Sequence, residues 1–238
     1  MEKIQSIEKL FTLLLEYSYL ILPIIYILSS LRLNNWFKND KIMSLLLGIY
    51  GLYFFLLLHF YNDIPKDLKK LYQSVYTFSE YLFFAYILYH FISNKLFRKA
   101  ILGLSALFLV VQIAHYFFTK NQKLDSFSIG IETILIFLFI FTYFRQFFKH
   151  NVTRNIYEYQ RFWLIVGILL YLGCGFFFNI LVNYIPKDQF LEFWHYTYIP
   201  EIIKNILFTI VILGVPSLTN EKSQPRKKFP DVPNLDII

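Results

Sequence analysis

Apolar residues run along the chain in seven long stretches that are separated by short polar segments. Each stretch holds about 20 residues, the length that an α-helix needs to cross a hydrocarbon layer roughly 30 Å thick. The apolar residues form unbroken runs and lack the one-sided pattern of a soluble helix bundle, so they predict an all-α, integral membrane seven-transmembrane-helix bundle. The stretches lie near 11–31, 42–60, 71–92, 99–118, 126–146, 162–184 and 194–215.

The segments between the stretches are too short to fold as soluble domains, which predicts one membrane domain over residues 1–216. The composition agrees, since 57% of the 238 residues are apolar and 21% are aromatic. After Pro216 the chain becomes polar and basic, which predicts a flexible cytoplasmic tail over residues 217–238. The expected environment is therefore the lipid bilayer of a cell membrane, crossed several times.

The distribution of basic residues predicts the orientation, because Lys and Arg in short loops are retained on the cytoplasmic side. Of the 23 Lys and Arg residues, 14 fall in the first, third and fifth loops and the tail, and 8 fall at the N-terminus and in the other loops. The remaining one, Lys204, lies within the seventh stretch. This bias favours an N-out/C-in orientation. The abundance of Phe, Tyr, Ile, Lys and Asn is typical of an AT-rich bacterial genome, so we expect a bacterial inner membrane.

One sequence match suggests an internal repeat. Ile-Pro-Lys-Asp occurs at residues 64–67 and again at residues 185–188, an offset of 121 residues. The same offset carries Glu80 of the third stretch onto Glu201 of the seventh. Such a pattern fits a parallel 3+1+3 duplication, in which two groups of three helices flank a single one. A coincidence stays open, because Pro-Lys-Asp is common turn chemistry.

Ionisable residues inside the stretches are the strongest functional signal, because each costs about 2.5–3.5 kcal/mol at bilayer depth. Counted along each helix, they fall about 8–15 Å below the predicted outer boundary. Other polar residues lie at similar depth, so the sequence predicts a polar ligand pocket in the outer half of the bundle. The candidate ligand-binding residues are Lys204, Glu80, Glu132, Glu201, Glu16, Asn205, Gln112, His115, Tyr17 and Tyr76.

Lys204 is the one cation among these candidates, and its partner is open at this point. Glu201 is three residues away on the same helical face, and Glu80 or Glu132 can reach the lysine across the bundle. Four carboxylates and one amine in a partly dehydrated site cannot all stay charged, so at least one carboxylate is expected to hold a proton. The alternative to a ligand pocket is a buried polar network that only fixes how the helices pack.

Several chemistries lack support in the sequence. The five histidines never recur as HxxH or HxxxH, so no metal site is expected. GxSxG, P-loop and dinucleotide signatures are missing, and the loops are too small for a kinase or ATPase. We therefore predict no catalytic residues and no nucleic-acid partner, and an enzyme is the less favoured class.

Lys204 in the seventh helix of an N-out bundle resembles the retinal-binding lysine of microbial rhodopsins, and Glu80 then resembles the third-helix counterion. The resemblance covers topology, length and these two positions. The family's Arg and Trp beside the counterion are absent from residues 77–82, and its sixth-helix aromatic and proline pattern is missing from residues 163–178. The resemblance implies a retinal Schiff base at Lys204, a minor alternative to the expectation of no cofactor.

These observations favour a receptor-like or sensory module that binds a small extracytoplasmic ligand. Because the loops are too small to hold a signalling domain, it would signal through a separate cytoplasmic or membrane partner. A small-solute or proton-coupled transporter built from two three-helix repeats is the alternative from another class. An intramembrane enzyme and a purely structural subunit also stay open.

Overall fold

The computed structural model describes residues 2–31, 41–118, 126–150, 159–181 and 195–214. Within these ranges the chain folds into seven α-helices joined partly by 3-10 turns, which confirms the all-α fold class. The 3-10 turns are η1 (Tyr61–Asp63), η2 (Lys66–Leu68) and η4 (His195–Thr197). The helices are α1 (Glu2–Leu31), α2 (Lys41–Phe60), α3 (Lys69–Phe91), α4 (Lys95–Phe118), α5 (Ser126–His150), α6 (Gln160–Leu181) and α8 (Tyr198–Leu213).

Five of these helices are long and apolar enough to cross a membrane, namely α1, α2, α4, α5 and α6. The prediction of a multi-pass membrane protein is confirmed at this level. The other two helices differ for separate reasons. Helix α8 has only 16 residues, because the predicted seventh stretch begins as the 3-10 turn η4. Helix α3 carries polar residues along much of its length, among them Gln73, Thr77 and Glu80. The predicted tail, 217–238, lies outside the described residues.

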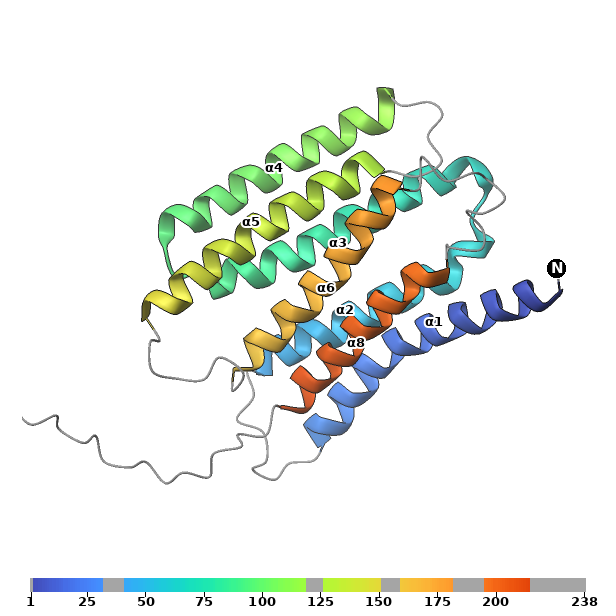
Figure 1. The fold of residues 1–238 in the computed structure, drawn as a ribbon, viewed down its shortest axis with the longest axis horizontal. Helices are drawn as coiled ribbons and strands as arrows, with labels where there is room; N and C mark the ends of the chain where they lie inside the picture. Colours follow the sequence, from blue (N-terminus) through green and yellow to red (C-terminus); the bar gives the residue numbers. More distant parts are fainter. Residues whose placement is uncertain (1, 32–40, 119–125, 151–158, 182–194, 215–238) are drawn as a thin grey trace, which may run out of the picture.

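The helices form two packed groups with α6 between them (Figure 1). In one group α1 packs on both α2 and α8, and in the other α3 packs on α4 and α5. Helix α6 packs closely on α8 and also contacts α5. By contrast, the backbones of the consecutive helices α2 and α3 come close to each other at few points, and aromatic side chains such as Phe54 and Phe83 pack between them. We call this boundary between α2 and α3 the α2/α3 seam.

Glycines allow the closest helix contacts in the tightly packed places. A Cβ atom added to Gly51 of α2 would lie 2.6 Å from the Cβ of Leu22 and 2.7 Å from the carbonyl oxygen of Tyr19, both in α1. That carbonyl lacks its usual helical donor because the residue four positions on is Pro23. Between α6 and α8, a Cβ on Gly167 would lie 3.3 Å from the ring of Phe208. Small residues at these points let helix backbones approach closely, as in membrane proteins generally.

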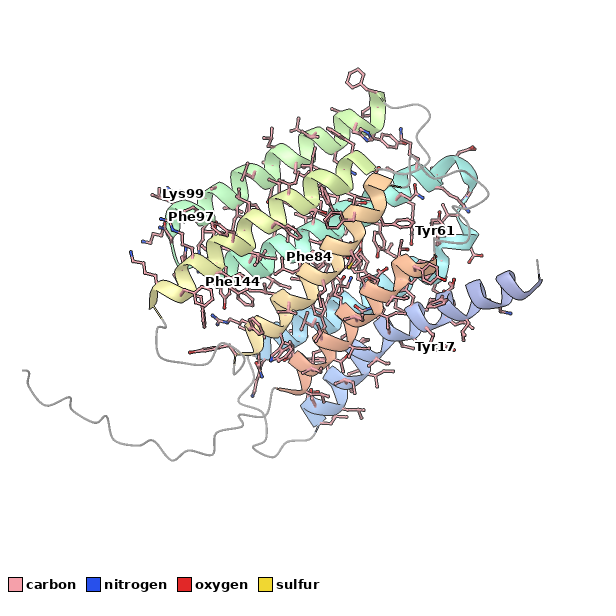
Figure 2. All side chains as sticks on the ribbon, in the orientation of Figure 1. Tyr17, Tyr61, Phe84, Phe97, Lys99 and Phe144 are labelled. Atoms are coloured by element: carbon pink, nitrogen blue, oxygen red, sulfur yellow. The ribbon has the colours of Figure 1, made fainter. Side chains whose placement is uncertain are left out.

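The side chains separate into an aromatic interior and an apolar outer surface (Figure 2). Phe84 lies fully buried inside the bundle, whereas Tyr17 projects from α1 away from it. Many large apolar residues on the outer surface are exposed, as expected where lipid replaces water around a helix bundle. Tyr61 and Lys99 lie at opposite ends of the bundle, and we name these the Tyr61 end and the Lys99 end.

Candidate functional site

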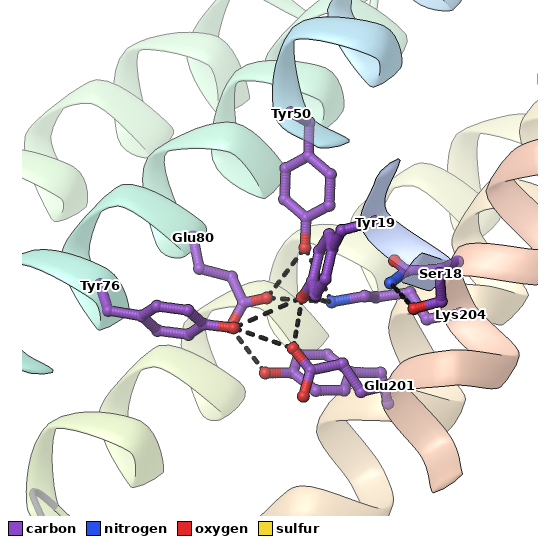
Figure 3. Close-up of polar contacts among 9 residues, drawn as sticks. Ser18, Tyr19, Tyr50, Tyr76, Glu80, Glu201 and Lys204 are labelled. Carbon is purple, nitrogen blue, oxygen red and sulfur yellow. Dashed lines mark hydrogen bonds and ion pairs between the residues drawn. The ribbon is translucent and has the colours of Figure 1, made fainter. Parts of the chain in front are cut away.

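Charged and phenolic side chains from five helices meet between the helices, most of them fully buried, and Figure 3 draws them. We call this set the charge cluster. Its charged members are almost sealed from solvent, with relative exposures of 0% for Lys204, 3% for Glu80 and 8% for Glu201. The charge cluster consists of Tyr19 (α1), Tyr50 (α2), Tyr76 and Glu80 (α3), Tyr171 (α6), and Glu201 and Lys204 (α8).

Lys204 uses all three of its ammonium hydrogens inside the cluster. Its Nζ donates to Oε1 of Glu80 at 3.1 Å, to the hydroxyl of Tyr50 at 2.7 Å and to the hydroxyl of Tyr19 at 3.1 Å. The contact with Glu80 is an ion pair between α8 and α3. Of the partners open from the sequence, the structure therefore places Glu80 against the lysine. A buried pair of this kind compensates the cost of removing two charges from water only when further hydrogen bonds complete it.

Glu80 is equally well satisfied. Oε1 accepts from Lys204 and, at 3.0 Å, from the hydroxyl of Tyr50. Oε2 accepts from the hydroxyl of Tyr171 at 2.7 Å. The carboxylate is thus held from α2, α6 and α8, and every one of these bonds leaves α3 for another helix.

Four aromatic rings surround the ammonium group of Lys204. The distances from Nζ to the ring centroids are 3.8 Å for Tyr171, 5.3 Å for both Tyr19 and Tyr50, and 5.7 Å for Phe84. The faces of such rings carry negative partial charge and attract a cation. Because these rings fill the space around Nζ, the residues present do not fit a retinal chain attached to Lys204.

Glu201 differs from Glu80 in two ways: its hydrogen-bond donors are uncharged, and both of them donate to the same carboxylate oxygen. Oε1 accepts from the hydroxyls of Tyr19 and, at 2.8 Å, Tyr76. Oε2 accepts no hydrogen bond from any residue that the structure describes (Figure 3). Tyr19 also accepts from Lys204, so one continuous chain of hydrogen bonds links Glu201 through Tyr19 and Lys204 to Glu80.

The charges of the cluster do not balance. When both carboxyl groups and the amine are ionised and the phenols are neutral, the cluster holds two negative charges and one positive charge. A further positive charge, either a proton or a ligand cation, would complete the balance at low dielectric. Because Oε2 of Glu201 accepts no hydrogen bond from the described residues, we expect the missing positive charge to bind at Glu201.

The other predicted residues lie at varying distances from this centre. Asn205 is fully buried next to Lys204, and its Nδ2 donates to Ser18 of α1 at 2.8 Å. Gln112 joins α4 to α3 by donating to the carbonyl oxygen of Ser74 at 3.5 Å. Glu132 is buried on α5, near enough to Tyr81 of α3 to interact with it electrostatically.

Three predicted residues lie toward the periphery. Tyr17 is 57% exposed and points away from the bundle, because two helical positions separate it by about 200° from the buried Tyr19. Glu16 is half-buried on α1. His115 is half-buried near the end of α4, where its ring stacks on Phe127 at a centroid distance of 5.3 Å.

Three cluster members, Tyr19, Tyr50 and Tyr171, were not predicted from the sequence. For two of them a signal existed, since Tyr50 and Tyr171 are separated by 121 residues, the offset that relates Glu80 to Glu201. Both phenols bind Glu80.

Comparisons with known proteins give no family assignment: no protein-family model, curated protein or solved structure matches this chain. Among the described residues, His, Cys, Asp and Glu form no group of three that could hold a metal ion. The carboxylates, ammonium group and phenols of the charge cluster can exchange a proton or bind a small polar group.

Proposed function

We propose that this chain is a seven-span, N-out/C-in membrane protein of the receptor or sensory class. In this proposal the charge cluster receives a small polar ligand from outside, and the α2/α3 seam transmits its presence to a separate cytoplasmic or membrane partner. The observation that carries the proposal is the position of the cluster. It joins two groups of helices whose backbones make few direct contacts along this seam.

Side chains make the contact across the seam, through ring packing such as that of Phe54 on Tyr76 and through polar bonds. Lys204 and Tyr50 reach Glu80 from the α1, α2 and α8 group, and Tyr76 reaches back to Glu201. Hydrogen bonds to charged groups contribute about 1.5–3 kcal/mol each. A ligand that strengthens or replaces one or two of these bonds changes the free-energy difference between two arrangements of the helix groups by a few kcal/mol. That is enough to shift a two-state equilibrium strongly.

The helix lengths support seven crossings. The 23 residues of α3 extend about 34 Å, and the 16 residues of α8 extend about 24 Å. The three residues of η4 add about 6 Å in front of α8, giving roughly the thickness of a hydrocarbon core. The polar residues of α3 that lower its hydropathy include Glu80 and Tyr76, which face the charge cluster and not lipid.

A transporter remains the second candidate, and the repeat favours it. An offset of 121 residues relates Tyr50 to Tyr171 and Glu80 to Glu201, and all four lie in the charge cluster. The packing follows the same relation in part: α1 packs on α8 as α5 packs on α3, but α6 packs closely on α8 whereas the backbones of α2 and α3 come close at few points. Two related halves around a central site are typical of secondary transporters. If proteoliposomes that contain the protein accumulated a solute in a proton-coupled manner, the protein would be a transporter.

Distances between spin labels test whether the charge of the cluster changes how far apart the two groups of helices lie across the α2/α3 seam. One label pair, at Lys41→Cys and Lys95→Cys in a Cys174→Ala background, spans the two groups near the Lys99 end. A second pair, Lys95→Cys and Lys149→Cys, lies within one group and is the control. Glu201→Gln removes the unbalanced charge, as an occupied site would. We expect it to shift the first distance distribution and leave the second unchanged.

Glu132→Gln is the matched substitution, because Glu132 is also a buried carboxylate but lies on α5. It should leave both distances as they are in the parent protein. If Glu201→Gln also leaves the first distance unchanged, the cluster only fixes helix packing, and the proposed sensory role is wrong.

A further inference from the structure

The charge cluster has an outer face that is less enclosed than its centre. Glu201 lies one helical turn before Lys204 on α8, and Tyr76 lies one turn before Glu80 on α3, both toward the Tyr61 end. Tyr76 is half-buried and Glu201 retains a small exposed area, whereas Lys204 has none. A group entering from the Tyr61 end therefore meets Glu201 and Tyr76 first.

The outer face also has an unused acceptor. Glu201 is more than nine-tenths buried, and both phenols that bind it donate to Oε1. Oε2 receives no donor within the described part of the chain. Oε2 shares the small solvent-exposed area that Glu201 retains, so a donor group that arrives from the Tyr61 end can reach it.

Lys204 shows which chemistry this environment accommodates. Its ammonium group is held by one carboxylate, by phenol oxygens and by the faces of aromatic rings. Around Glu201 the phenols of Tyr19 and Tyr76 repeat part of this arrangement, and the ring of Tyr76 packs on the buried ring of Phe54 with a centroid distance of 4.9 Å. The difference is that the outer face has a carboxylate and no ammonium of its own.

We infer that Oε2 of Glu201 binds the ammonium group of a small organic amine, which enters from the Tyr61 end and completes the charge balance of the cluster. This inference rests on the proposed function and names the class of its ligand. Divalent metal ions suit the site less well, because calcium takes six to eight oxygen ligands and magnesium six. An ammonium group needs few acceptors and gains from aromatic faces.

Thermal unfolding of the purified full-length protein in detergent tests the inference, with methylammonium chloride as the probe and sodium chloride at equal ionic strength as the reference. We expect methylammonium to raise Tm by about 2–4 °C relative to sodium when present at several times its dissociation constant. Glu201→Gln should abolish this difference, and Glu132→Gln should retain it.

Three outcomes would overturn the inference: no difference between methylammonium and sodium, an equal difference in Glu201→Gln, or its loss in Glu132→Gln. If Glu201→Gln unfolds too early to be informative, Tyr76→Phe provides a second variant, which keeps the carboxylate and ring but should reduce the difference at least twofold. Failure of this experiment leaves the spin-label result intact. A seam that responds to Glu201→Gln without an amine effect would indicate a proton as the completing charge.

Discussion

Among single residues, Lys204 has the strongest predicted effect on stability. Lys204→Met leaves Glu80 and Glu201 buried without a cation, and breaking a buried pair in this way costs about 3–5 kcal/mol. The double variant Lys204→Met/Glu80→Gln removes the stranded charge of Glu80 and should recover at least half of that loss. Unfolding in mixed micelles with a rising fraction of denaturing detergent measures both values.

The double variant also separates the effect of the stranded charge from the effect of the lost ammonium hydrogen bonds. Glutamine keeps the shape of Glu80, and its single carbonyl oxygen can still accept a hydrogen bond from either Tyr50 or Tyr171. A double variant as unstable as Lys204→Met alone would mean that the hydrogen bonds of Lys204 to Tyr19 and Tyr50, not the compensation of the Glu80 charge, hold the cluster together.

The sequence predicts part of the cluster at this scale, for a physical reason. Glu80, Glu201 and Lys204 are recognisable because an ionisable group at bilayer depth is rare and costly. Tyr19 is not recognisable, because it is one of 19 tyrosines and phenols are frequent both at membrane interfaces and in cores. The choice of Glu80 as the partner of Lys204 depends on how α3 and α8 rotate about their axes, which helix pattern alone leaves open.

At the scale of helices, apolar runs predict where membrane helices lie but not how closely they pack. The stretches near 42–60 and 99–118 coincide with α2 and the larger part of α4, whereas the stretch near 194–215 begins as a 3-10 turn. Nothing in the run lengths indicates that the backbones of α6 and α8 come close along their length while those of α2 and α3 do not. That asymmetry depends on individual small residues such as Gly167, which lies against Phe208 and Leu207.

Gly51 is the helix-packing position with the clearest prediction. In Gly51→Ala the new methyl group would meet Leu22 and the Tyr19 carbonyl oxygen at 2.6 and 2.7 Å, so α1 must move away from α2. We expect a loss of about 1–3 kcal/mol, as for other overpacked sites. Gly103→Ala is the control, because nothing lies within 4 Å of its Cβ position, and it should be neutral or stabilising by up to about 1 kcal/mol. Equal stability of the two variants would contradict the close α1–α2 contact.

At the scale of the whole molecule, the number of crossings determines which ends share a side of the membrane. Helix α3 is decisive, because it connects Asp63 to Lys99 and is not among the five helices that qualify by length and apolarity. If α3 crosses the bilayer, these two residues lie on opposite sides; if it lies within one leaflet, they share a side. In a membrane-crossing α3 its polar residues form a buried site, whereas in an α3 that lies within one leaflet they form a surface at the membrane interface.

Labelling of intact cells with a membrane-impermeant maleimide distinguishes these arrangements. In a Cys174→Ala background we expect Asp63→Cys to be labelled from outside and Lys99→Cys only after lysis, because Lys99 lies at the end richer in basic residues. The reverse pattern would leave α3 a membrane helix but invert the orientation, so that Glu201 would open toward the cytoplasm. Labelling of both positions from one side would remove α3 from the membrane and, with it, the reason for Glu80 and Tyr76 to be buried. An extracellular ligand requires the expected pattern, since only that pattern places the free oxygen of Glu201 nearest the outer surface.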